Sequence, residues 1–179
     1  MTAKKKSAKK KSVTKKKSVT KKTPGVPKAL KRARIKKILV PVDFSAFSEA
    51  ALAYAQPIAE AFNARIDVVY ADETNYGEIA TFGPIDVDLL RTQYSDESNQ
   101  RIKEVTKELK GRGLRSTGIV RPGRAHHVIT EVAKEQNSDL IVIATHGHSG
   151  LEHLLMGSTA ENVVRHATCP VLAVRADKE

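Results

Sequence analysis

The segment from residue 141 to residue 160 combines residue types that could bind a phosphate group. It begins with three consecutive β-branched residues, as expected for a strand that is buried on both faces of a parallel sheet. Gly147 and Gly157 follow, and Ser158 and Thr159 stand where a new helix would begin. Glycine lets the backbone turn tightly and approach a ligand, and the free N–H groups at a helix N-terminus attract anions. The segment therefore predicts a nucleotide-binding loop.

The spacing of these residues narrows the prediction. Nine residues separate Gly147 from Gly157, and Ser158 follows directly. This pattern resembles the nucleotide-binding signature of the universal stress protein family, which is Gly, two residues, Gly, nine residues, Gly and then Ser or Thr. The first glycine of the signature falls on Ala144, a departure of one methyl group. The alternative is a strand-to-helix connection without a ligand, because glycine motifs have many false positives.

The resemblance is carried by three segments in all, one of which overlaps the loop. Residues 36–45 (KKILVPVDFS) resemble the first strand of the family and the Asp-bearing turn after it. Residues 138–147 (SDLIVIATHG) resemble its fourth strand, and residues 163–174 (VVRHATCPVLAV) resemble its last helix and last strand. The resemblance thus covers about residues 36–175 and keeps the order of the motifs.

Outside these motifs, apolar runs alternate with helical patterns, which indicates an α/β fold with a parallel sheet. Strands are expected at 38–42, 65–70, 114–120, 140–145 and 171–174, and helices at 46–62, 86–110, 125–136 and 158–166. Ser45 is the predicted N-cap of the first helix, which Pro57 should kink or split. Residues 72–85 are expected to form a long loop. The family resemblance implies a Rossmann-like, open five-stranded parallel sheet of order 3-2-1-4-5 with helices on both faces.

That strand order would bring two distant segments together. In open α/β sheets, ligands bind beyond the carboxyl ends of the strands at the point where the strand order reverses. Here this point lies between the first and fourth strands. Pro41, Val42 and Asp43 end the first of these strands, and Ala144 lies near the end of the other. We therefore expect these residues to surround one crevice.

The family resemblance also implies a ligand, ATP or another adenine nucleotide, with Mg²⁺ as a candidate companion. Val42 and Asp43 would hold the nucleoside, with Asp43 accepting a hydrogen bond from adenine or ribose. The adenine would lie between Ala71, after the second strand, and Ile143. The ribose and the phosphates would be held by Gly147, Gly157, Ser158 and Thr159. The alternative for Asp43 is a helix N-terminal carboxylate that accepts hydrogen bonds from the amides of residues 45–47.

The sequence contains little that indicates catalysis. His146, His148 and His153 do not have the spacing of a regular metal-ligand motif, and no metal site is predicted. We find neither a Walker lysine motif nor a recognisable Ser/His/Asp motif. No catalytic residue is therefore assigned. A nucleotide-responsive protein of the stress response is favoured over an efficient enzyme, with a slow ATPase or phosphotransfer protein as the alternative.

The net charge of +11 combines two parts of opposite sign. Residues 1–37 contain fifteen lysines, two arginines and no acidic residue, a formal charge of +17. The remaining 142 residues carry 14 basic and 20 acidic side chains, a formal charge of −6. The hexapeptide KKKSVT occurs at 9–14 and again at 15–20. Because so little of this segment is apolar, we expect a disordered basic tail over residues 1–35 and a folded domain over residues 36–176.

The tail has the composition of a segment that binds polyanions. It resembles the lysine-rich tails of linker-histone-like proteins, and its charge predicts binding of DNA or RNA through residues 4–37 without sequence preference. Anionic membranes and a solubilising role are the alternatives. If nucleic acid is the main partner, the chain would be an architectural protein that uses its domain only for dimerisation.

Two further expectations concern assembly and location. The short apolar strand at 171–174 should lie at a sheet edge, and its unpaired backbone groups, together with the family resemblance, predict a homodimer. The single cysteine, Cys169, excludes an intramolecular disulfide, and no apolar run reaches transmembrane length. No secretory signal peptide is evident at the N-terminus. A cytoplasmic location is predicted, with nucleoid association through the tail as a hypothesis.

Overall fold

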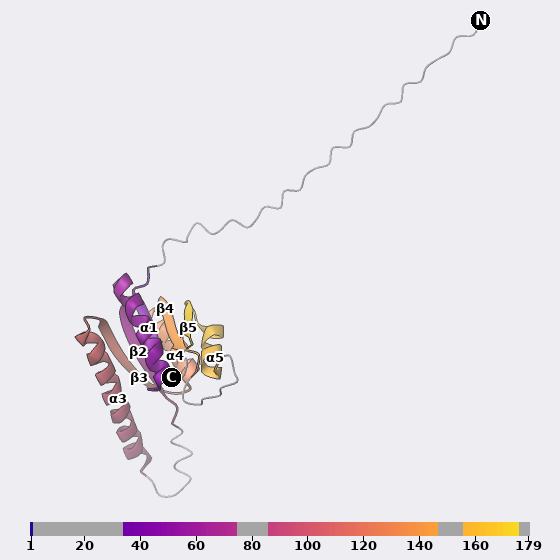
Figure 1. Ribbon diagram of the computed structural model, residues 1–179. Coiled ribbons are helices and arrows are strands. Elements are labelled where there is room, and N and C mark those ends of the chain that lie inside the picture. Colours follow the sequence, from indigo (N-terminus) through magenta and orange to yellow (C-terminus); the bar gives the residue numbers. More distant parts are fainter. Residues whose placement is uncertain (2–33, 75–85, 147–155, 176–179) are drawn as a thin grey trace. The chain divides into compact units, whose positions relative to one another are not determined.

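The computed structural model describes Met1 and residues 34–74, 86–146 and 156–175 (Figure 1). Residues 34–179 form one unit and residues 1–33 another. The predictions about the tail therefore lie outside the described residues, as do those about Gly147, His148 and His153 and most of the expected loop at 72–85.

The described residues form a five-stranded parallel sheet in the order β3-β2-β1-β4-β5. Its strands are β1 (Lys37–Pro41), β2 (Arg65–Asp72), β3 (Arg115–Pro122), β4 (Leu140–Ala144) and β5 (Val171–Val174). Its helices are α1 (Ala46–Phe62), α3 (Val87–Gly111), α4 (Ala125–Gln136) and α5 (Ser158–His166). The predicted fold class and strand order are confirmed.

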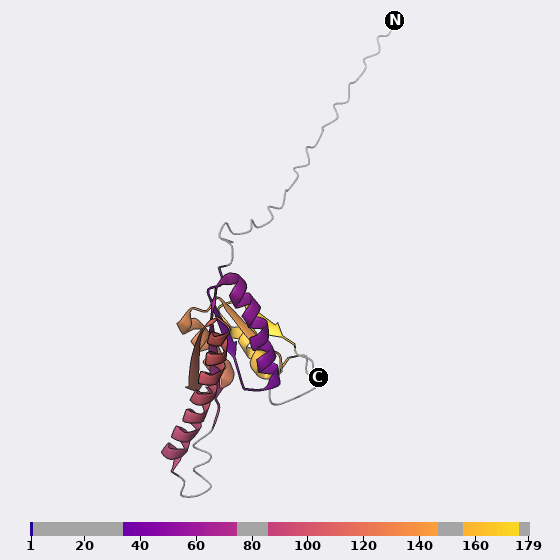
Figure 2. The same cartoon turned by 60° about the vertical axis from the view of Figure 1, so that its left-hand side comes forward.

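The sheet is covered on both faces, which explains its nearly continuous apolar strands. Ile38 and Val40 of β1 belong to the core cluster packed under α1 and α3. Leu39, between them, belongs to the cluster packed under α4 and α5. Figure 2 shows α1 and α3 running alongside the strands. None of the described helices is long and apolar enough to span a membrane.

Helix α1 is not split at Pro57, which was one of the two effects predicted for this proline, the other being a kink. The helix runs without interruption from Ala46 to Phe62, with Pro57 inside it. Proline removes the hydrogen bond to the carbonyl four residues earlier, which here belongs to Ala53. Both residues lie on the exposed side of the helix, where water can satisfy that carbonyl. Ser45 caps the helix as predicted, accepting a hydrogen bond from the Ser48 amide at 3.3 Å.

Four of the strands have C-terminal ends that differ from the predicted ones. β2 and β3 each continue two residues beyond their predicted ends, pairing Ala71 with Arg121 and Asp72 with Pro122. Ala71 therefore lies within β2, and the prediction that it follows the strand is wrong. β1 and β4 each end one residue earlier than predicted, at Pro41 and Ala144.

Candidate functional site

A cavity of about 640 Å³ lies at the carboxyl ends of β1, β2 and β4. This volume is within the range of small-molecule sites, and the position is where the strand order reverses. Nine of the ten sequence-predicted binding residues line it, and the tenth, Gly147, lies outside the described residues. The nine are Pro41, Val42, Asp43, Ala71, Ile143, Ala144, Gly157, Ser158 and Thr159. The fold thus brings together segments more than 100 residues apart.

The turn after β1 fixes the carboxylate of Asp43. Its Oδ1 accepts hydrogen bonds from the Ser45 amide at 3.0 Å and from the Ser45 hydroxyl at 2.5 Å. Ser45 in turn caps α1, so the carboxylate is tied to the start of this helix. The amide contact is part of the helix-terminal arrangement considered as the alternative for Asp43. Because Asp43 also lines the cavity, the structural role and the proposed binding role are compatible.

The start of α5 forms the opposite side of the cavity. Gly157 donates its N–H to the Thr145 carbonyl at 2.7 Å, and a Cβ on Gly157 would lie 3.1 Å from the same oxygen. Glycine is needed here for close approach, since the φ of −69° is ordinary. Gly157 is also the N-cap residue of α5 and provides no side-chain acceptor for the first amides of the helix. Those amides are suited to an anion in the cavity.

The wall on the α4 side is mainly apolar. Ala71 and Ile143 lie beside Ala125 and Ile129 of α4. The Glu73 carboxylate accepts a hydrogen bond from the Ala125 amide at 2.7 Å, which joins the end of β2 to the start of α4. This side of the cavity therefore offers a fixed apolar surface that suits the flat face of a base.

The wall on the α3 side consists of residues that the sequence analysis did not identify. Phe44 has a φ of 60°, and its ring lies 4.9 Å from the Tyr70 ring. The guanidinium carbon of Arg101, in the middle of α3, lies 3.9 Å from the centre of the Phe44 ring. Burial raises the pKa of the Tyr70 hydroxyl, and the negative charge of Asp72 raises it further. Phe44 could have been noticed as the neighbour of Asp43, but no local motif marks Arg101.

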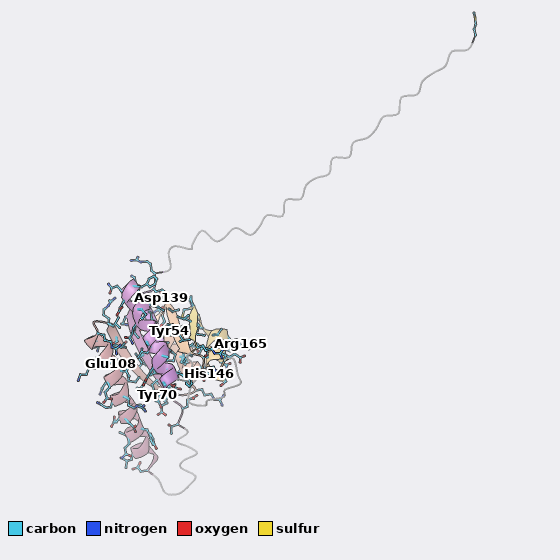
Figure 3. The ribbon with its side chains drawn as sticks, viewed as in Figure 1. Tyr54, Tyr70, Glu108, Asp139, His146 and Arg165 are labelled. Carbon is cyan, nitrogen blue, oxygen red and sulfur yellow. The ribbon has the colours of Figure 1, made fainter. Side chains whose placement is uncertain are left out.

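Of His146, His148 and His153, only His146 lies within the described residues. Its Nδ1 lies 3.0 Å from the Thr145 hydroxyl, and its ring lies 5.9 Å from that of Phe47. Figure 3 shows His146 and Tyr70 at the end of the domain opposite to Asp139, which precedes β4. The described part of the chain contains no group of three side chains that could hold a metal ion.

The chain is similar to known proteins over nearly all of the unit formed by residues 34–179. A profile of the Universal stress protein family matches residues 34–175. Universal stress protein MJ0531 of Methanocaldococcus jannaschii is 33% identical over 145 residues, covering 80% of this chain and 84% of that protein. Universal stress protein A homolog 1 of Coxiella burnetii is 37% identical over 143 residues, covering 78% of this chain and 95% of that protein.

Solved structures show the same fold. The structure of hypothetical protein MJ0577, also of M. jannaschii, has a TM-score of 0.72 at 26% identity and covers 82% of this chain and 99% of its own. A universal stress protein in complex with cAMP has a TM-score of 0.60 at 23% identity, covering 80% and 99%. The Archaeoglobus fulgidus universal stress protein in complex with dAMP has a TM-score of 0.55 at 20% identity, covering 78% and 98%.

Proposed function

The chain belongs to the universal stress protein family, and on that premise we propose that it binds an adenine nucleotide, with ATP as the first candidate, in the cavity between β1 and β4. The observation that carries this proposal is the convergence of the Asp43 turn and the uncapped start of α5 on one cavity. The two neighbouring structures with cAMP and dAMP support an adenine nucleotide as the ligand class.

The proposed roles follow the chemistry of the lining. Val42 and Asp43 hold the nucleoside, and Pro41 and Ala144 form the floor where β1 and β4 end. Ala71 and Ile143 contact the base. The phosphates lie at the start of α5, against Gly157 and near the amides of Ser158 and Thr159, and Gly147 would join them. A Mg²⁺ ion bound with ATP would draw its ligands mainly from phosphate oxygens and water.

The test of this proposal is calorimetry of ATP binding to wild-type protein and to Gly157→Val. The valine side chain would project where the phosphates are proposed to lie and crowd the Thr145 carbonyl, so we expect affinity to fall by about tenfold or more. Gly111→Val is the matched control, because nothing lies within 4 Å of a Cβ at Gly111. Equal ATP affinity in the wild type and a folded Gly157→Val protein would remove the assignment.

We propose a binding protein rather than an efficient enzyme. Asp43 is the one acidic residue in the turn after β1, and its carboxylate is already held by Ser45. Such a carboxylate could orient a water molecule, so slow ATP hydrolysis is the alternative activity. Phosphate release during long incubations with ATP, compared between wild type and Asp43→Asn, distinguishes the two.

A second proposed function concerns the tail. The formal charge of +17 on residues 1–37 against −6 on the rest favours nucleic acid as a partner of the tail alone. The folded domain would then carry the tail and serve for dimerisation. We further propose a homodimer formed through β5, and a cytoplasmic location with nucleoid association.

A further inference from the structure

The cavity extends beyond the residues proposed for the adenine nucleotide. Ala125 and Ile129 line it from α4, on one face of the sheet. Phe44, Tyr70 and Arg101 line it from the other face, where Phe44 and Tyr70 pack against the core cluster under α1 and α3. This second part of the cavity, called here the α3 side, has no role in the binding scheme proposed above.

Arg101 gives the α3 side a distinctive chemistry. It is the only lysine or arginine among the described residues that line the cavity. Its guanidinium lies over the Phe44 ring, and no hydrogen bond or ion pair joins it to another described residue. A guanidinium stacked on a ring keeps its N–H donors available in its own plane. Such a group is suited to the oxygens of a phosphoryl group.

The Phe44 ring, which lies under the Arg101 guanidinium and is called here the platform, is held from several sides. Phe44 has a left-handed backbone, which is uncommon for a bulky residue and often marks a functional position. Its ring contacts Tyr70 as well as Arg101, and Ser98, three residues before Arg101 on α3, lies near enough to Tyr70 to lower the pKa of its hydroxyl. Because Phe44 directly follows Asp43, the guanidinium of Arg101 lies over the residue next to the proposed nucleoside contact.

The charges around the platform sharpen this role. Asp43 and Asp72 both lie close enough to act electrostatically on Tyr70. Without Arg101, these two carboxylates would repel an anion on the α3 side. Arg101 also acts electrostatically on Tyr70, with the opposite sign, and it is the one lysine or arginine in the described lining, so anion binding on this side would depend on it.

We propose that Arg101, supported by Phe44, binds a second phosphoryl group of the ligand, at a position separate from the phosphates at the start of α5. The ligand class is then an adenine nucleotide phosphorylated at two separate places on the nucleoside, such as the 5′ and 3′ oxygens. This inference rests on the proposed nucleotide site. It adds a specificity-determining residue and an anion subsite on the α3 side.

The experiment compares calorimetric affinities for adenosine 3′,5′-bisphosphate, ADP and 5′-AMP. ADP has the same number of phosphates as the bisphosphate but carries both in one chain, so it controls for ligand charge. We expect wild-type protein to bind the bisphosphate about tenfold more tightly than 5′-AMP, the gain expected of one charge-assisted contact. Adding inorganic phosphate to protein saturated with 5′-AMP tests whether a free anion occupies the same subsite.

The variants are Arg101→Gln, Arg101→Lys and the matched control Lys103→Gln, which removes the same charge from an exposed position on the same helix. Arg101→Gln should lower bisphosphate affinity more than 5′-AMP affinity and so abolish the preference for the bisphosphate. Arg101→Lys should retain part of the preference, since it keeps the charge but loses the planar donor set. Lys103→Gln should behave as wild type.

Two different failures can be told apart. If 5′-AMP and ATP bind but Arg101→Gln leaves the bisphosphate preference unchanged, or wild type shows no preference, the α3-side subsite is wrong and the nucleotide site stands. If no adenine nucleotide binds to wild-type protein at all, the proposed function is overturned and this inference with it. Thermal unfolding of each variant near the wild-type temperature excludes misfolding as the cause.

Discussion

Two glycines show how individual residues shape this domain. Gly157 lies at the cavity, where a Cβ would make a tight contact of 3.1 Å with the Thr145 carbonyl oxygen. Gly118, in β3, lies under α3, and a Cβ there would come 2.1 Å from Ile102 Cγ2 and 3.3 Å from Thr106 Cγ2. The neighbour of Gly157 is thus a backbone oxygen at the proposed site, and the neighbours of Gly118 are buried side chains in the core.

Gly118→Ala should destabilise the domain. Ile102 is 3% exposed and packed in the core, so it cannot move away without opening the contact between α3 and β3. We expect the free energy of unfolding, measured with urea, to fall by about 1–3 kcal/mol. Gly111→Ala is the control and should change stability by less than about 0.5 kcal/mol, because its Cβ meets no neighbour. Equal stability of the two variants would show that α3 adjusts freely.

Cavity residues that follow buried strands were predictable from the sequence, whereas those brought to the cavity by packing were not. Asp43 directly follows an apolar run, and Gly157 and Ser158 belong to a spaced motif, so local order was enough to predict them. Tyr70 lies inside β2 rather than after it, and Arg101, inside a helix, lines the cavity only because α3 packs against β2 and β3. No sequence pattern of their own marks such residues.

At the scale of elements, helix boundaries were more predictable than strand boundaries. α1, α4 and α5 have the predicted bounds, and for α1 the N-cap Ser45 gives a local signal. The ends of β2 and β3 depend on how far the two strands continue to pair, and this is a non-local property. The strand order came from the family resemblance, because the handedness of the crossovers alone does not determine it.

The two edges of the sheet differ in ways that favour dimerisation at β5. β3 carries Arg115 and Arg121, and charged side chains discourage strand pairing. β5 consists of four apolar residues, and Leu172 within it is 37% exposed. Val174 is 5% exposed and packs in the core, so a lysine there would disturb folding as well as pairing. Leu172 is therefore the better position at which to test the edge.

Leu172→Lys should weaken the homodimer. A lysine charge brought into an apolar interface loses its hydration, and we expect the dimer dissociation constant to rise by about tenfold or more. The control is Leu89→Lys, at an exposed leucine on α3, which packs against β2 and β3 at the other end of the sheet. Light scattering over a concentration series measures both. A monomeric wild-type protein, or equal dissociation constants for the two variants, would contradict dimerisation through β5.

At the scale of the whole molecule, the chain joins two parts of opposite charge. Residues 38–179 carry a formal charge of −6 and include every residue of the proposed nucleotide site. Residues 1–37 carry +17 and contain no aromatic residue, so base stacking is not available to them. Nucleic-acid binding and nucleotide binding should therefore be separable by truncation.

The full-length chain should bind duplex DNA without sequence preference, and a chain lacking residues 1–34 should not. If the tail contacts about eight phosphates, the logarithm of the binding constant should fall against the logarithm of salt concentration with a slope of about −7. Gel shifts of both chains over a salt series measure this, and ATP calorimetry on the truncated chain confirms that its domain is intact. Residues 35–179 carry 16 basic and 20 acidic side chains, a formal charge of −4 that repels phosphates. Tight DNA binding by the truncated chain would therefore contradict the division of roles, as would no binding by the full-length chain at low salt.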